Sequence, residues 1–358
     1  MARDRNGVTL VATLRDVAAL AGVSVKTVSN VVNDFEFVRP STREKVREAI
    51  AELGYQPNLA ARQLRAGRTG VIGLAVPELK FSYFAELADA VLEAARARDY
   101  VVLIEQTGGD RDAEAALLTG SRTAMMDGLL FSPLGLSYED AGILDVGYPL
   151  VLLGERIFDG PTDHVVIQNV EGAAMATRRL LSAGRSRIAV LGAHEGERVG
   201  SAALRLRGYE EALLEAGIAF DPALVVAREG WHRRDGAEAM QELLDRGVGF
   251  DAVLALNDEL ALGSLRTLAQ HRIAVPEDVA VIGYDNVTES QFAMPSLTTV
   301  DPNRARVAEI AVEALVERIA GRVPADAGPR LFDVPARLVE RESTPVPVAA
   351  RASSVTAV

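Results

Sequence analysis

The pattern of apolar and polar positions near the start of the chain predicts two short helices separated by a tight turn. In residues 16–33, DVAALAGVSVKTVSNVVN, two runs with helical spacing flank Gly22, which permits the turn. Thr13 with Asp16 is a variant of the capping box, and Ser24 is a favoured N-cap for a second helix over 25–32. The apolar positions expected to pack in this unit are Leu14, Val17, Ala18, Ala21 and Val28.

A third helix is predicted from a second capping box, Ser41-Thr42-Arg43-Glu44, and it should end at Gly54 as a C-cap. Its expected core positions are Val46, Ala49, Ile50 and Leu53. The first two helices have the spacing of a helix-turn-helix. Three helices in this short span can form a minimal core.

From residue 71 onward, short uninterrupted apolar runs alternate with amphipathic stretches, which predicts parallel strands covered on both faces. The runs are 71–76, 101–104, 128–131, 150–153, 187–191, 252–256 and 279–284. The amphipathic stretches include 84–98, 112–122, 171–183, 205–216, 234–246 and 259–271. These elements suffice for two doubly wound α/β units that divide near residues 160–170. Such sheets bind ligands at the carboxyl ends of their strands.

The charge is distributed unevenly along the 358 residues. A net charge of −12 would by itself argue against a nucleic-acid partner. Residues 1–68, however, hold 11 Lys and Arg against 7 Asp and Glu, whereas the remainder holds 27 against 43. The chain is therefore expected to carry a basic front module on an acidic body.

Composition excludes several classes of protein. The chain has no Cys, and its four His are scattered singly, so we expect neither a metal site nor a cofactor. No uninterrupted apolar run approaches the ~18 residues of a membrane span, and the start, MARDRNGVTLVATL, does not look like a secretion signal. We expect a cytoplasmic, nucleoid-associated protein without a membrane partner.

The second predicted helix carries an unusual number of small polar side chains at its front. In a helix-turn-helix this edge enters the major groove, where Lys26 suits guanine, Asn30 suits adenine and Val25 can meet a thymine methyl. Ser29 and Asn33 lie on the same polar edge, and Ser24 and Thr27 are better placed for phosphate. The alternative is a helical hairpin whose polar face meets only water.

The front of the chain resembles the DNA-binding headpiece of the LacI/GalR (lactose-repressor) family. The matching stretches are TLRDVAALAGVSVKTVSNVVN, STREKVREAIAELGYQPN and AARQLRAG, and the similarity continues to LVERESTP near residue 345. The resemblance implies a hinge helix near residues 58–65 that folds when two subunits sit on one operator. It also implies that Leu64 wedges into the minor groove and kinks the DNA, with Asn58 and Ala61 as further DNA contacts. Packing of Leu64 against the body is the alternative.

The resemblance implies an α/β protein with an all-α helix-turn-helix headpiece (1–56), a hinge helix (57–68) and a periplasmic-binding-protein-like body (69–345). We expect the body to comprise subdomains 69–166 plus 299–328 and 167–298 plus 329–345, followed by a disordered tail (346–358). Tetrameric relatives add a C-terminal leucine heptad helix, whereas this chain ends PVPVAARASSVTAV, so a homodimer is expected.

Polar and aromatic residues that follow the predicted strands form the candidate effector site. They are Tyr83, Phe84, Ser132, Arg156, Arg205, Trp231, Asn257, Asp258 and Asp285. Such a set suits a hydroxyl-rich, ring-shaped ligand. Arg205, Asn257 and Asp285 match family effector positions. Asp258 could also cap the helix after it, Arg156 could form a surface salt bridge, and Trp231 could belong to the core.

Three departures from the family pattern leave the identity of the effector open: Gln168-Asn169, Asp301-Pro302 and Gly154. The predicted function is a regulator, expected to be a repressor, that binds operator DNA and whose DNA affinity is switched by a small effector, expected to be a carbohydrate. A free-standing sugar-binding protein is the alternative. An α/β enzyme is disfavoured because the chain lacks the nucleotide-binding and nucleophile motifs G-x-G-x-x-G, P-loop and G-x-S-x-G.

Overall fold

The computed structural model describes residues 12–32, 35, 37–55, 68–324 and 326–344. The chain divides into two compact units, Met1–Thr69 and Gly70–Val358, which are described separately as headpiece and body. In the described residues, no helix combines the length and the apolar character needed to cross a membrane. Nor do three or more His, Cys, Asp or Glu side chains gather there in a group that could hold a metal ion.

The first two headpiece helices begin and end as the sequence predicts. Helix α1 spans Leu14–Ala21, and the Thr13 and Asp16 side chains form the reciprocal capping box. Helix α2 spans Val25–Val32, and the Ser24 hydroxyl accepts a hydrogen bond from the Thr27 amide at 3.1 Å. Gly22 adopts a left-handed conformation with φ of 64° between them. The helix-turn-helix is therefore fixed by local capping and a glycine turn.

The third headpiece helix differs from the prediction at its start and in one core position. Helix α3 spans Pro40–Leu53 and begins at a proline, with no side-chain cap on its N-terminus. Proline has the φ of a helix and no amide hydrogen to satisfy, so it starts the helix without the predicted Ser41 box. Leu53 is exposed, and the buried ring of Tyr55 joins the core instead.

The described part of the body contains two six-stranded sheets. The first has the order β11-β5-β4-β3-β1-β2 and belongs to what we call lobe 1; the second has the order β12-β10-β9-β8-β6-β7 and belongs to lobe 2. The strands are β1 Val71–Val76, β2 Val101–Gln106, β3 Gly128–Phe131, β4 Leu150–Leu153, β5 Asp163–Ile167, β6 Ile188–Ala193, β7 Val225–Ala227, β8 Ala252–Ala255, β9 Ala280–Tyr284, β10 Thr298–Asp301, β11 Leu331–Val334 and β12 Arg337–Val339. Apart from the antiparallel pair β10–β12, the described pairs are parallel.

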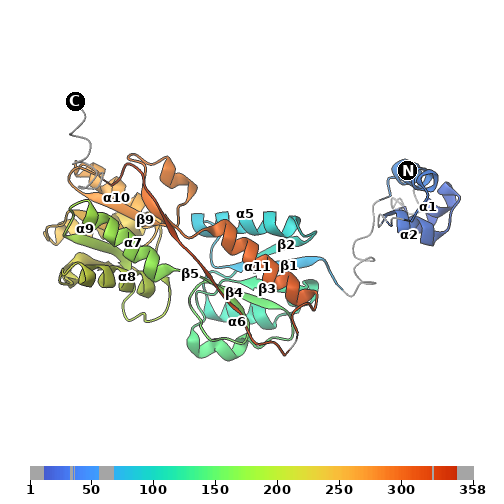
Figure 1. The fold of residues 1–358 in the computed structure, drawn as a ribbon, viewed down its shortest axis with the longest axis horizontal. Helices are drawn as coiled ribbons and strands as arrows, with labels where there is room; N and C mark the ends of the chain where they lie inside the picture. The colour runs from blue at the N-terminus through green and yellow to red at the C-terminus, as the bar shows by residue number, and fades with distance from the viewer. Residues whose placement is uncertain (1–11, 33–34, 36, 56–67, 325, 345–358) are drawn as a thin grey trace, which may run out of the picture. The chain divides into compact units, whose positions relative to one another are not determined.

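Helices cover these sheets, and α5 and α11 lie side by side on lobe 1 (Figure 1). Lobe 1 has α5 Ser82–Arg96, α6 Arg111–Thr119 and α11 Arg304–Ile319; lobe 2 has α7 Asn169–Ser182, α8 Ser201–Glu215, α9 Arg233–Asp245 and α10 Asp258–Gln270. Short 3₁₀ helices span Ser121–Met125, Tyr138–Leu144, Pro222–Leu224 and Thr288–Gln291. A shared apolar cluster connects the lobes, which positions the carboxyl ends of both sheets around one space.

The chain is predicted to pass between the two subdomains three times. The second and third of these predicted positions are wrong. Strand β10, at 298–301, pairs with β9 in lobe 2, although residues from 299 were expected in the first subdomain. Strand β11, at 331–334, pairs with β5 in lobe 1, although it was expected in the second. In the described residues the chain thus changes lobe after β5, after β10 and after β11. Pairing across more than 100 residues decides the membership of β11, and local patterns do not encode it.

Strand β2 departs from the expectation that the apolar strands are covered on both faces. It lies at the edge of the lobe 1 sheet (Figure 1), where Val101 is 61% and Leu103 is 38% exposed. An apolar run therefore indicated a strand correctly but not its burial. Exposed apolar side chains on an edge strand favour a further packing partner.

Candidate effector site and DNA-reading helix

A cavity of about 620 Å³ lies between the carboxyl ends of the strands of the two lobes. Seven of the nine predicted effector residues line it: Tyr83, Phe84, Ser132, Arg156, Arg205, Trp231 and Asp285. Asn257 and Asp258 do not. The volume lies within the usual range for small-molecule sites.

Arg205 is the most constrained of the lining side chains. It projects from the first turns of α8, is 3% exposed, and donates from Nε to the Asn169 side-chain oxygen at 2.7 Å. Its guanidinium also contacts the Leu256 carbonyl and lies 3.6 Å above the Tyr284 ring. Its Nη2 atom is 3.5 Å from Oδ1 of Asp285. These contacts hold a cationic donor in place before any ligand binds.

Asp285 lies directly after β9 in a backbone conformation that is rare for residues other than glycine. Its φ is 111°, and that of Asn286 is 51°. Such a conformation costs about 1–3 kcal/mol and is typically retained at functional sites. Burial raises the pKa of Asp285 to about 6, while the charges of Arg205 and Arg304 oppose the rise.

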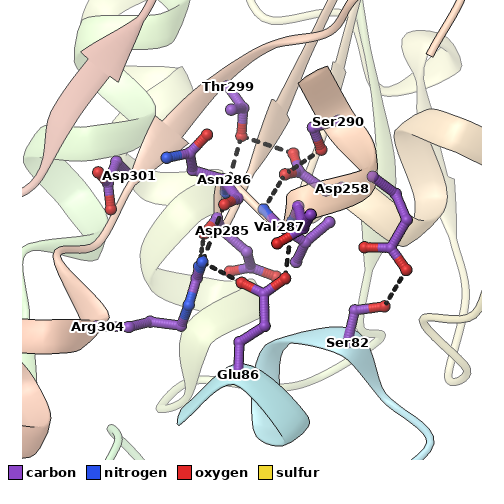
Figure 2. A network of polar contacts seen from close by, with 12 residues as sticks. Ser82, Glu86, Asp258, Asp285, Asn286, Val287, Ser290, Thr299, Asp301 and Arg304 are labelled. Atoms are coloured by element: carbon purple, nitrogen blue, oxygen red, sulfur yellow. Dashed lines mark hydrogen bonds and ion pairs between the residues drawn. The ribbon is translucent and has the colours of Figure 1, made fainter. Parts of the chain in front are cut away.

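Arg304 holds this strained turn from the other lobe. It donates to the carbonyl oxygens of Asp285 and Asn286, the latter at 2.9 Å, and pairs with Glu86 (Figure 2). Glu86 in turn accepts a hydrogen bond from the Thr288 amide at 2.7 Å. Both Arg304 and Glu86 belong to lobe 1, so this network ties lobe 1 to the segment of lobe 2 that carries Asp285.

Two further contacts join the lobes at the start of α5. The Ser82 hydroxyl donates to Glu259 at 2.6 Å, and Glu259 also pairs with Arg233 at 2.9 Å. The His232 ring lies 3.0 Å from the Glu78 carboxylate. Polar contacts between the two lobes therefore bridge the cleft on this side.

Asn257 and Asp258 position other residues. Asn257, not Asp258, is the N-cap of α10: its oxygen accepts from the Leu260 amide at 2.8 Å, and its amide donates to the Trp231 carbonyl at 3.0 Å. The backbone of Asn257 is extended, as an N-cap requires. Asp258 is already the first residue of the helix, and its side chain contacts the loop after β9 instead.

The fully buried Asp258 accepts hydrogen bonds from Val287, Ser290 and Thr299, at 2.9, 2.7 and 2.6 Å (Figure 2). Burial raises its pKa to about 7, and the nearby Asp285 carboxylate adds to the rise. Asp258 thereby fixes the loop that follows Asp285.

Aromatic rings form the apolar part of the cavity wall. The Trp231 ring lines the cavity, and its Nε1 donates to the Gly192 carbonyl at 2.8 Å, so the residue serves both the core and the cavity. Tyr83 lies beside Phe84 with ring centroids 5.2 Å apart. Burial raises the pKa of Tyr83 well above its usual value, so its hydroxyl keeps its proton.

The structure adds Glu155, His194, Glu197 and Ser201 to the lining. Glu155 accepts from the Ile167 amide at 3.0 Å and the Ser201 hydroxyl at 2.9 Å, and burial raises its pKa. Position after a strand could have identified Glu155 and His194. Glu197 lies in a loop between glycines, where no periodic signal points to a site.

The predicted DNA-reading edge lies on one side of α2. Val28 and Val31 are buried in the headpiece core, whereas Val25 is 40% exposed and Lys26 and Ser24 are also exposed. Thr27, Ser29 and Asn30 are half-buried. Asn33, Asn58, Ala61 and Leu64, together with the predicted hinge helix and tail, lie outside the described residues.

Comparison with known proteins identifies both parts of the chain. Residues 13–58 match the model for bacterial regulatory proteins of the lacI family, and residues 177–344 match a periplasmic binding protein-like domain. The HTH-type transcriptional repressor PurR of Vibrio atlanticus is 34% identical over 335 residues, which cover 93% of this chain and 98% of that protein.

Solved structures of relatives agree. The lac repressor dimer bound to operator and the anti-inducer ONPF is 27% identical, with a TM-score of 0.79 over 94% of this chain and 100% of that one. The complex of the transcriptional regulator CelR with cellobiose is 34% identical, with a TM-score of 0.68 over 93% of this chain and 99% of that one. These relatives are regulators rather than enzymes. The chain therefore belongs to the lacI family of bacterial regulatory proteins, and it is a ligand-responsive transcriptional regulator.

Proposed function

We propose that the protein is a repressor that binds a roughly palindromic operator as a homodimer, and that a sugar in the cavity between the lobes lowers its operator affinity. The observation that carries this proposal is the prepositioned pair of Arg205 and Asp285 in the cleft, on the same chain as a capped helix-turn-helix. We propose that it acts on DNA in the cytoplasm. We also propose that the cavity binds the effector without converting it to a product.

The exposed edge of α2 supports the DNA-binding part of the proposal. Val25, Lys26, Ser29 and Asn30 would contact base edges, and Ser24 and Thr27 would lie near phosphate. Asn33, Asn58 and Ala61 would add contacts, and Leu64 would wedge into the minor groove at the operator centre. Leu64→Ala should then weaken specific binding more than non-specific binding.

Exposed apolar side chains on the body support a dimer. In lobe 1, Val101 and Leu103 on β2 and Met125 at the end of the Ser121–Met125 3₁₀ helix are exposed. In lobe 2, Phe292 and Met294 are exposed. A palindromic operator has two half-sites, which a two-fold dimer matches. The related lac repressor was solved as a dimer on its operator.

The lining of the cavity supports a carbohydrate effector. Carboxylate, amide and guanidinium groups bind hydroxyls, and the Trp231 and Tyr83 rings can cover the apolar face of a sugar. Arg205 and Asp285 would anchor the polar edge. A relative of similar length was solved with cellobiose.

Lobe closure links the cavity to DNA. A ligand changes operator affinity only to the extent that it binds one closure state more tightly than the other. In return, operator DNA must change the affinity for the ligand by the same factor. The contacts of Arg304, Glu86 and Ser82 across the cleft support such a coupled response of the two lobes.

The test is a mobility-shift assay with DNA flanking the protein's own gene, repeated with a panel of neutral sugars. We expect a specific shift that one or more sugars relieve. A protein that binds sugar but no DNA would be a binding protein and would contradict the proposal. Specific DNA binding that no sugar alters would contradict the sugar-gating part alone.

A further inference from the structure

The headpiece exposes two phenylalanine rings in the segment between α2 and α3. Phe37 is 84% and Phe35 is 52% exposed, although phenylalanine is among the residue types most often buried. Neither ring joins the apolar cluster of the described headpiece, whereas the neighbouring Val38 packs against it. The two rings contact each other edge to face, with centroids 5.8 Å apart and an angle of 63° between their planes. We call Phe35 and Phe37 the aromatic pair.

Backbone contacts attach the aromatic pair to the end of the predicted DNA-reading helix. The Phe35 amide donates to the carbonyl of Asn30, a member of the predicted reading edge, at 2.9 Å. Arg43 of α3 donates from Nη2 to the Phe35 carbonyl at 2.9 Å, and the Val38 amide donates to the same oxygen at 3.4 Å. Three contacts therefore hold the Phe35 backbone at the end of α2, and its ring supports that of Phe37.

The side chains of this segment favour contact with bases over contact with phosphate. In the sequence, Asp34 and Glu36 alternate with the aromatic pair, and no Lys or Arg stands between Asn33 and Val38. Phosphate is bound by cations and hydrogen-bond donors, and ionised carboxylates and phenyl rings are neither. In the major groove, by contrast, phenylalanine contacts the C5-methyl group of thymine, and carboxylates accept from the amino group of cytosine.

A thymine contact would also remove the exposed Phe37 ring from water. Of the four DNA bases, only thymine presents a methyl group in the major groove, so an apolar ring there distinguishes thymine from the others. The burial of the methyl group and of the ring that meets it is favourable. The aromatic pair thus offers an apolar reader beside the polar reading edge.

We propose that Phe37 reads the C5-methyl group of a thymine in each half-site of the operator, and that Phe35 positions its ring. The proposal rests on the proposed function of the headpiece in operator binding. It adds a base contact after the end of α2 to those of the predicted reading edge.

The test uses the full-length protein and a duplex that the wild type selects from a random-sequence library. Each thymine of the selected operator is replaced in turn by uracil, symmetrically in both half-sites, which removes only the methyl group. Mobility shifts at one salt concentration give the affinity of each duplex for the wild type and for Phe37→Ala, Phe37→Leu, Phe35→Ala and Val25→Ala. Leu20→Ala is the control, because Leu20 is an apolar residue on α1 that is 46% exposed.

We expect one thymine at which uracil weakens wild-type binding about four-fold per half-site, or about fifteen-fold for both, which is the effect of one buried methyl group. Phe37→Ala should bind the thymine duplex more weakly and lose this sensitivity. Phe37→Leu, which keeps an apolar side chain, should retain part of it, and Phe35→Ala should reduce it. Leu20→Ala should retain all of it, and Val25→Ala should lose sensitivity only at a different thymine.

Three results would overturn this proposal: wild-type operator affinity in Phe37→Ala, full sensitivity of Phe37→Ala to uracil at every position that affects the wild type, or a wild type that no uracil weakens. If the wild type selects no sequence from the library, both this proposal and operator recognition would be contradicted. Selection of a specific operator together with any of the three results would contradict the thymine contact alone.

Discussion

At the scale of single residues, partners from distant segments of the chain orient the anchor residues Arg205 and Asp285: Asn169 and the Leu256 carbonyl contact Arg205, and Arg304 holds the turn of Asp285. Arg205 and Asp285 could be predicted because they match family effector positions, and Trp231 because of its place between a strand and a helix; all three line the cavity. The capping role of Asn257 and the full burial of Asp258 depend on partners such as Trp231, Val287 and Thr299. Local spacing carries no information about those partners.

The first residue-scale prediction concerns Arg205. Arg205→Ala should leave a folded dimer that still binds operator, and it should lower effector affinity about 10- to 100-fold, because a charge-assisted hydrogen bond contributes about 1.5–3 kcal/mol. Operator affinity with and without effector provides the measurement. Arg207→Ala is the matched control, because Arg207 is an exposed arginine on the same helix. A response of the Arg205→Ala variant at the wild-type effector concentration would show that the effector binds elsewhere.

The second residue-scale prediction concerns the effect of pH on Asp285. A ligand hydroxyl that donates to Asp285 prefers the ionised carboxylate, so effector affinity should fall as pH drops below about 6. The stability of the fold responds to pH in the opposite direction. Because the pKa of Asp285 is higher in the folded than in the unfolded protein, its ionised carboxylate destabilises the fold above pH 6. This destabilisation disappears as the pH falls from about 6 toward the pKa of the unfolded protein, 3.8.

Calorimetry from pH 5 to 8 tests the expected fall in affinity. Asp285→Asn should bind more weakly than wild type at pH 8 and should lose the part of the pH dependence that lies near 6. An unchanged profile in that variant would assign the titration to another group.

At the scale of elements, the strands with long apolar runs could be predicted, and the short strands with a weaker apolar pattern could not. Apolar strands such as β1 and β9 were located within a residue or two. Strands β5, β7, β10, β11 and β12 were missed, because β7 has only three residues and the others are short and contain charged residues or threonines. Helix α3 shows a different limit, since proline at its first position starts the helix without the predicted serine cap.

The prediction at this scale concerns α2 as a DNA-reading helix. Asn30→Ala should cost about 1–3 kcal/mol per half-site and relax the preference at one symmetric base pair. Binding to a library of operator variants measures both effects. Asn30 is half-buried beside the buried core positions Val28 and Val31, so the variant should keep most of its thermal stability. Uniform weakening on all sequences would instead indicate a phosphate contact.

At the scale of the whole molecule, the two-unit organisation and the class of fold could be predicted, but the assignment of late segments to lobes could not. The alternation of apolar runs and helices predicted two doubly wound units, and the two sheets confirm them. Membership of β10 and β11 depends on pairing with β9 and β5.

The prediction at this scale concerns assembly. Light scattering should give a dimer at micromolar concentration, and Leu103→Lys on the exposed edge strand should shift it toward monomer and weaken operator binding. Leu214→Lys is the control, because Leu214 is an equally apolar and strongly exposed residue on α8. A tetramer in the wild type, or a Leu103→Lys dimer as stable as wild type, would contradict the proposed interface.

The late crossings between the lobes have a consequence for how the protein is made. Strands β11 and β12 complete the two sheets, and both come from residues 331–339, after all the other described strands. A nascent chain on the ribosome can finish its headpiece early, but it holds two incomplete sheets until almost all of the body has emerged. A premature stop after α11 would therefore damage both lobes at once, and neither lobe could be produced as one contiguous fragment.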